Sequence, residues 1–161
     1  MTANTGRTVS KWMDFRVDDS AGTLRSIPVN SVNGVGLDYP FKDVTAFQDA
    51  LKGVLPEQPD CQIEIKGPVD TSAAATAGTL SGSHTVLSNL AGGNTPLSLD
   101  VQLGIRQAWE SGEPQFGISS SSTSGFLCSS YIVDVNSMEY TAKFAMFPGS
   151  SAPAWGTSAE T

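Results

Sequence analysis

Hydrophobic and polar residues alternate in several short runs along this chain, and alternation of this kind is typical of half-buried β-strands. The first run covers 11–18 and the second covers 23–35. Because Pro28 interrupts the second run and cannot donate a backbone hydrogen bond, that run is predicted at a sheet edge or a bulge. The remaining predicted strands lie at 61–69, 97–107, 115–119, 126–135 and 138–147.

One segment has the spacing of a helix. Within 44–55, apolar residues recur at i, i+4 and i+7 or i+8, which places them on one face of a helix. Thr45 and Gln48 fit a capping box at its start, and Pro56 ends the pattern. We therefore predict an amphipathic helix over about 44–55 that lies against a sheet, and a short second helix at 84–90. The apolar stripe of the first helix consists of Phe47, Leu51 and either Val54 or Leu55.

The segments without such patterns divide the chain. Residues 70–82 are almost entirely Ala, Thr, Ser and Gly, a composition that builds no core and is typical of a long functional loop. Residues 1–10 are predicted to form a flexible N-terminal arm, and 148–161 a C-terminal arm. One domain, 11–147, remains between them, which suits a chain of 161 residues. The predicted fold class is mainly β, a β-sandwich or barrel with one flanking α-helix, a long loop and terminal arms.

The charge of the chain restricts its partners. It has 9 Lys and Arg against 16 Asp and Glu, a net charge of −7, so neither half has the positive charge that gripping nucleic acid requires. No apolar run approaches the roughly 18 residues of a membrane-spanning helix, and the polar start at 1–7 gives no expectation of an export leader. Cys61 and Cys128 lie far apart and outside any C-x-x-C motif, so we expect both to be reduced and buried.

Residue types that carry catalysis are scarce. The one histidine, His84, excludes a multi-histidine metal site, and the sequence contains no G-x-S-x-G motif that would accompany a serine nucleophile. His84 is interpreted as a capping or surface residue. Glu110 and Glu113 flank a predicted turn and are expected to be solvated charges. No nucleotide-binding glycine motif is present either, so we predict no catalytic, cofactor or metal site.

The three tryptophans, Trp12, Trp109 and Trp155, leave two interpretations open. Their indoles could stack on the rings of a bound sugar, or they could be core and subunit-contact residues. Trp155 lies in a segment without a strand pattern, where a large exposed indole needs a cover. Because aromatic anchors are typical of protein interfaces, the contact interpretation is favoured.

Several motifs follow one another in a distinctive order. Residues 43–70 combine a T-x-F-x-D start, a loop and an alternating strand that ends in G-x-x-D, and GSHTVLSNL follows at 82–90. A Gly-acid-Pro-x-aromatic hairpin, a strand with Tyr131 and a final Ala-Trp-Gly-Thr at 154–157 come after it. From about residue 31 onward, this order resembles the tail tube (major tail) proteins of long-tailed, siphovirus-type bacteriophages. The residues in the family's places are Thr45, Phe47, Asp49, Leu55, Pro56, Gly67, Asp70, Gly112, Glu113, Pro114 and Phe116.

The resemblance implies a structural virion protein. Tail tube proteins are β-sandwich or barrel-like subunits that form rings, generally hexameric, and the rings stack into a hollow tube through which the genome passes. It follows that this chain would be a homo-oligomer, located in the virion tail after assembly in the host cytoplasm, with other phage tail proteins as partners. It would need no cofactor and would not insert into a membrane. DNA would pass through the lumen without specific binding, and an acidic wall favours such passage because it repels the phosphate backbone.

The candidate subunit contacts come from the loop and the C-terminal arm, and we expect the loop and both termini to become ordered when rings stack. Two other classes of protein stay open: a monomeric carbohydrate- or receptor-binding β-sandwich module, and a capsid decoration protein. A hydrolase that uses His84 or the glutamates is a third alternative. The contact candidates are Asp70, Thr71, Ser72, Gly78, Gly82 and Trp155.

Overall fold

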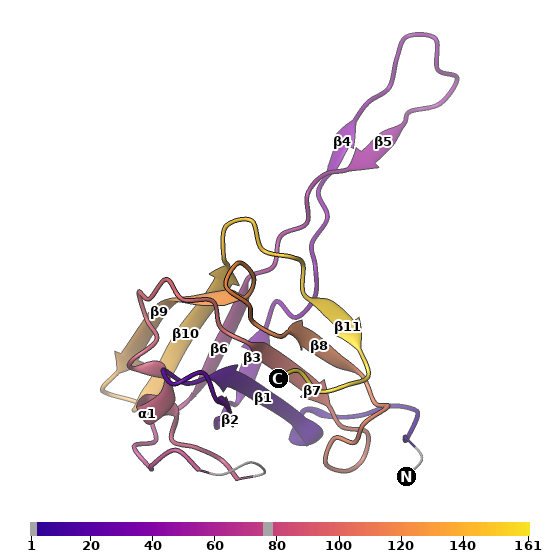
Figure 1. Ribbon diagram of the computed structural model, residues 1–161. Helices are drawn as coiled ribbons and strands as arrows, with labels where there is room; N and C mark the ends of the chain where they lie inside the picture. Colours follow the sequence, from indigo (N-terminus) through magenta and orange to yellow (C-terminus); the bar gives the residue numbers. More distant parts are fainter. Residues whose placement is uncertain (1–2, 76–78) are drawn as a thin grey trace.

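The alternating runs form two sheets that pack face to face, and a hairpin projects from them (Figure 1). The computed structural model describes residues 3–75 and 79–161. The first sheet has the order β11-β8-β7-β1-β2 and the second has the order β3-β6-β10-β9, with antiparallel pairing throughout. The strands of the first sheet are β1 (Met13–Asp18), β2 (Leu24–Ser26), β7 (Leu99–Leu103), β8 (Gln115–Ile118) and β11 (Ala154–Gly156). Those of the second are β3 (Ser31–Asn33), β6 (Ile63–Pro68), β9 (Phe126–Asp134) and β10 (Glu139–Met146).

The core lies between the two sheets. Alternation along β1 turns Phe15 and Val17 inward, and along β10 it turns Phe144 toward them, so that the rings of Phe15 and Phe144 lie 5.9 Å apart. Each fully buried side chain of this size stabilises the fold by about 1.5–3 kcal/mol. Cys61 and Cys128 are free and belong to this core, as predicted, and burial raises the pKa of both thiols to about 11.

The predicted strands are confirmed with shorter bounds, except that the run 23–35 is divided into two strands, β2 and β3. Pro28 lies between β2 and β3, which belong to different sheets, so the interruption marks the point where the chain crosses the sandwich. The short second helix is confirmed as α1 (Ser83–Leu87), which buries Val86 and Leu87 against the sandwich. A single 3-10 turn, η1 (Ser10–Trp12), precedes β1. The protein is therefore mainly β, as its alternation predicts.

The prediction of a helix over 44–55 is wrong. This segment is the end of an antiparallel hairpin, β4 (Phe41–Asp43) and β5 (Val54–Pro56), and it lies far from the sandwich (Figure 1). A short amphipathic helix gains its stability mostly by burying its apolar face on a neighbour. Here no sheet of the same chain lies within reach of that face, so the stripe has nothing to pack on.

The two ends of the chain, predicted as arms, both contact the sandwich or its loops. Within 148–161, β11 pairs with β8, and Thr161 accepts a hydrogen bond of 2.7 Å from Ser98, so this segment is part of the sandwich. At the other end, the Arg106 guanidinium donates to the Thr5 carbonyl (2.9 Å). Among the residues that the structure describes, no helix is long and apolar enough to cross a membrane.

Candidate functional site

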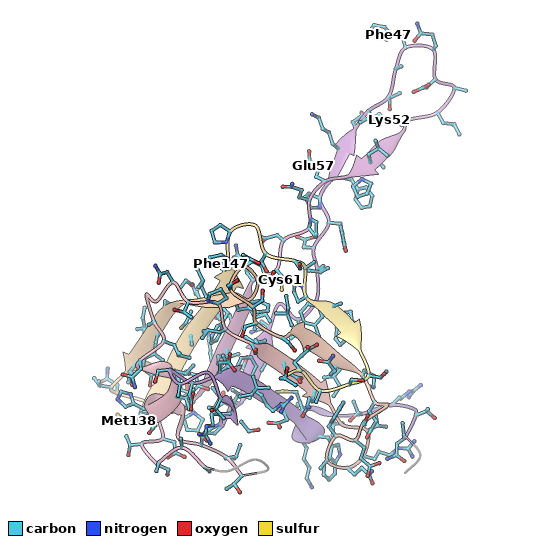
Figure 2. The ribbon with its side chains drawn as sticks, in the orientation of Figure 1. Phe47, Lys52, Glu57, Cys61, Met138 and Phe147 are labelled. Carbon is cyan, nitrogen blue, oxygen red and sulfur yellow. The ribbon has the colours of Figure 1, made fainter. Side chains whose placement is uncertain are left out.

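The projecting hairpin, defined here as residues 38–60, is the most exposed part of the protein. All of its residues except Gly53 are exposed, although it carries large apolar side chains. Phe47 is fully exposed at the far tip, as Figure 2 shows, and Leu51 is 83% exposed. Single exposed apolar residues are common, whereas a group of them on one element marks an interaction surface. The others in this group are Tyr39, Phe41, Val44, Val54 and Leu55.

Polar residues hold the projecting hairpin in its shape without help from the sandwich. The Thr45 hydroxyl accepts from the Gly53 amide (2.8 Å) and donates to the Gly53 carbonyl (3.2 Å). Asp43 and Asp49 accept from the amides of Thr45 (2.9 Å) and Ala46 (2.8 Å). Side chains of Thr and Asp often bond to nearby backbone in this way, in competition with helix formation. The residues that resemble a helix cap therefore stabilise a turn.

A groove of about 470 Å³ opens on the sandwich itself, beside β3. Because β3 is short and lies at the edge of its sheet, the inner face of the opposite sheet is left partly uncovered there. We call this the edge groove. Its lining is mostly apolar, and Thr8, Val9 and Ser10 of the N-terminal segment form one wall. The other residues around it are Met13, Asn30, Ser31, Val32, Val35, Val101, Leu103, Gly104 and Trp155.

Trp155, one of the predicted contact residues, lies in this groove. It stands on β11 opposite Phe116 of β8, and the two rings pack with centroids 5.1 Å apart. Phe116 is buried, whereas Trp155 remains 52% exposed. One face of the indole is thus fixed against the core while the rest borders the edge groove, an arrangement suited to an aromatic anchor.

The first of the predicted loop contacts, Asp70, is held in place by hydrogen bonds. Asp70 donates its amide to the Ser83 hydroxyl (3.0 Å) and accepts from the Ser72 amide (2.8 Å), and hydrogen bonds from Ser72 lower the pKa of Asp70. Thr71 and Ser72 are exposed, whereas Gly82 is buried, and a Cβ there would lie 2.2 Å from the Ser72 carbonyl oxygen. Gly82 therefore lets the two ends of the loop pass closely.

The last of the predicted loop contacts, Gly78, lies outside the described residues.

His84 is not paired with a serine. Its Nδ1 lies 3.0 Å from the Tyr131 hydroxyl, and the adjacent Ser83 hydroxyl donates to the Pro68 carbonyl (2.8 Å). The ring is half-buried on α1, so His84 links the helix to β9. Within 3–75 and 79–161, no three His, Cys, Asp or Glu side chains lie close enough to hold a metal ion.

Glu113 differs from its prediction as a solvated charge. It is fully buried, and its carboxylate accepts from the amides of Ile105 (2.9 Å) and Glu110 (3.0 Å). Trp109 donates to the Glu113 carbonyl (3.1 Å). The carboxylate therefore satisfies backbone donors of an irregular loop that has no strand partner, which is a structural role.

A second buried acid lies under the C-terminal segment, on the outer face of the first sheet. Asp100 is fully buried and accepts from Arg16 (2.6 Å) and from the Glu160 amide (3.1 Å). The Glu160 carboxylate accepts from Ser119 (2.6 Å) and Gln115 (3.2 Å). Burial raises the pKa of Asp100, and the Arg16 hydrogen bond opposes that rise. The C-terminal segment of the chain thus covers the polar outer face of the first sheet.

Comparison with known proteins finds similar folds among solved structures but no similar sequence. No family model and no curated protein matches the sequence. Among solved structures, a chain of the sheath–tube complex of an extracellular contractile injection system (PVC) has a TM-score of 0.54 at 12% identity, over 94% of this chain and 93% of that one. The sheath/tube terminator of the same system gives 0.57 at 13% identity, over 96% and 99%.

A third solved structure, the tube-terminating cap of the anti-feeding prophage, has a TM-score of 0.52 at 10% identity, over 98% of this chain and 97% of that one. The identities are low, so the likeness is one of fold. It covers almost the whole of each chain. The protein therefore has a fold similar to that of tail tube and tube terminator components of contractile injection systems.

Proposed function

We propose that this protein is a structural tail subunit that assembles with copies of itself into rings, and that the rings stack into a tail tube. The observation that carries the proposal is the projecting hairpin, which displays large apolar side chains with no cover from its own chain. The similarity of fold to tube and terminator components supports it.

In finer detail, we propose hexameric rings of the bacteriophage type, with other tail proteins at the ends of the tube and DNA passing through the lumen without specific binding. The net charge of −7 supports passage without trapping, because a cationic wall would hold the phosphate backbone. Trp155 and the exposed loop residues Thr71 and Ser72 are proposed as contacts between subunits, and Asp70 fixes the base of that loop.

A tube terminator is the second candidate function. It is favoured by the sheath/tube terminator, of which 99% is covered at a TM-score of 0.57. One face of a terminator ring would bind the last ring of the tube, and its other face would not accept a further ring.

Negative-stain electron microscopy of the purified protein, over a series of concentrations, tests both candidates. A tube subunit is expected to give stacked rings or cylinders whose length rises with concentration. A terminator is expected to give single rings that do not elongate. A monodisperse monomer at every concentration in sedimentation velocity would contradict the proposal, and a glycan titration that changes tryptophan fluorescence would favour a carbohydrate-binding module.

A further inference from the structure

The projecting hairpin and the edge groove are two unpartnered apolar surfaces on different parts of one molecule. The hydrogen bonds within 39–59 are all internal to the hairpin. At its base, Asp38 and Asp60 exchange two backbone hydrogen bonds of 2.9 and 2.8 Å, which hold the stems together. The tip points away from the sandwich (Figures 1 and 2), so it does not reach the groove of its own chain.

The two surfaces match in chemistry. The tip presents Phe47 and Leu51, and the groove presents aliphatic side chains beside the exposed part of Trp155. Its volume of about 470 Å³ falls in the range of roughly 300–1,000 Å³ typical of pockets that enclose a small ligand. Two bulky side chains on the exposed loop 44–53 are an occupant of suitable size, and aromatic anchors in pockets commonly dominate an interface.

The charges are weakly opposite as well. Beyond its base at Asp38 and Asp60, the projecting hairpin carries three acidic residues and two lysines, a net charge of −1. The wall of the edge groove at Thr8–Ser10 is flanked by Arg7 and Lys11, both exposed, and residues 3–13 contain no acidic residue. Opposite charges around an apolar contact speed association and fix its orientation. The acidic residues beyond the base are Asp43, Asp49 and Glu57.

We propose that the tip of the projecting hairpin, Phe47 and Leu51, seats in the edge groove of a second copy of this chain, against Trp155. This inference rests on the self-assembly proposed above and names the two surfaces that meet. Because tip and groove are different patches, each contact leaves one free tip and one free groove. Such a heterologous contact continues from copy to copy until a ring closes or a filament grows.

Mixing two complementary variants tests the pairing. The tip variant is Phe47→Asp with Leu51→Asp, and the groove variant is Val9→Asp with Trp155→Asp. Phe47 and Leu51 are exposed, so the tip variant is expected to keep the wild-type circular dichroism and urea midpoint. The groove variant also loses the Trp155 ring that packs on Phe116, so it is expected to keep the circular dichroism of the fold with a lower urea midpoint. Each variant alone is expected to stay monomeric, with self-association weakened at least about 30-fold. Together they are expected to form a heterodimer and nothing longer, because one intact tip and one intact groove remain.

Three outcomes separate the two proposals. Wild-type protein that stays monomeric contradicts self-assembly itself. If the wild type forms tubes and either variant alone also forms them, only the tip–groove pairing is overturned. The same holds if the wild type forms tubes and the mixture of variants gives no heterodimer in sedimentation velocity. The heterodimer is also expected to weaken slightly as salt rises, because the opposite charges around the contact are few.

A second measurement does not depend on any loss of assembly. A photo-crosslinking p-benzoylphenylalanine at position 47 keeps an aromatic tip, and illumination of the assembled protein followed by mass spectrometry identifies its neighbours. Adducts on the peptides that contain Val9, Val35 or Trp155 of another copy are expected. Adducts confined to β9 or α1 would overturn the pairing and leave self-assembly standing.

Discussion

The sandwich and the projecting hairpin follow opposite rules although they belong to one chain. In the sandwich, large apolar side chains such as Phe15 and Phe144 are buried and the polar residues between them face outward or pair. In the hairpin, Phe47 and Leu51 are exposed, and polar side chains hold the backbone. A hairpin of two strands is at best marginally stable in water. The comparison teaches that the sandwich specifies the fold, whereas the hairpin has a sequence suited to a partner surface.

Removing the projecting hairpin is expected to have the largest effect on assembly. Replacing 39–59 by an Asn-Gly turn joins Asp38 to Asp60, whose backbones already pair, and a turn of this type closes a hairpin well. The urea midpoint of the sandwich is expected to stay near the wild-type value, since no core residue is removed. Cylinders and rings are expected to disappear from electron micrographs. Tubes of normal length from this variant would show that the hairpin is not an assembly element.

Two phenylalanines give a matched test of the comparison. Phe144→Ala removes a buried ring, and the free energy of unfolding is expected to fall by about 3–5 kcal/mol. Phe47→Ala removes an exposed ring and is expected to change it by less than about 0.5 kcal/mol. Urea unfolding of the two variants measures both values. Equal losses of stability would mean that the hairpin packs on the sandwich of its own chain.

Ion pairs offer a smaller contrast within the sandwich. Arg16→Met leaves the buried Asp100 carboxylate without its 2.6 Å partner, and a loss of about 1.5–3 kcal/mol is expected. Lys143→Met breaks an exposed pair with Glu64 at 3.9 Å, and less than about 1 kcal/mol is expected. Thermal or urea unfolding of both variants checks the order. A larger loss for Lys143→Met would contradict the role given to the buried pair.

The smallest expected effect concerns pH. Burial raises the pKa of Asp14 above its ordinary value of 3.8, and its neighbours Ser26 and Arg16 oppose that rise. With a raised pKa in the folded state, the group's contribution to stability is complete below 3.8 and is lost as pH rises through the folded pKa.

Asn has no proton to lose at this position. Asp14→Asn is therefore expected to be more stable than wild type at neutral pH and equal to it below pH 3.8. Urea midpoints on both sides of that value measure the difference, and a constant difference across pH would contradict the assignment.

Much of the sandwich is predictable from its residues. Runs such as 61–69 alternate because one face of each strand is buried, and that cause is local enough to be visible in the sequence. The hairpin at 44–55 is not predictable in the same way. Its apolar residues have helical spacing, but a helix needs a surface to bury them on, and the chain supplies none. Asp43, Thr45 and Asp49 bond to the backbone of a turn instead.

The candidate contacts divide similarly. Trp155 could be found because a large indole in a segment without a strand pattern needs a cover, and the structure leaves it half exposed. The edge groove could not be found, since Val32, Val35 and Val101 come together only through the order of strands in two sheets. The prediction of a solvated charge at Glu113 is wrong for a related reason. A turn sequence gives no sign that the backbone amides of Ile105 and Glu110 will both donate to its carboxylate.

The paired stems at Asp38 and Asp60 free the segment between them from the demands of the fold. No strand register of the sandwich includes 39–59, so substitutions or changes of length there leave its architecture intact. In the assembly proposed above, the sequence of this segment would be constrained only by the surface that receives it. Two proteins of this kind could then share the scaffold and still not co-assemble, because the hairpin of one would not fit the groove of the other.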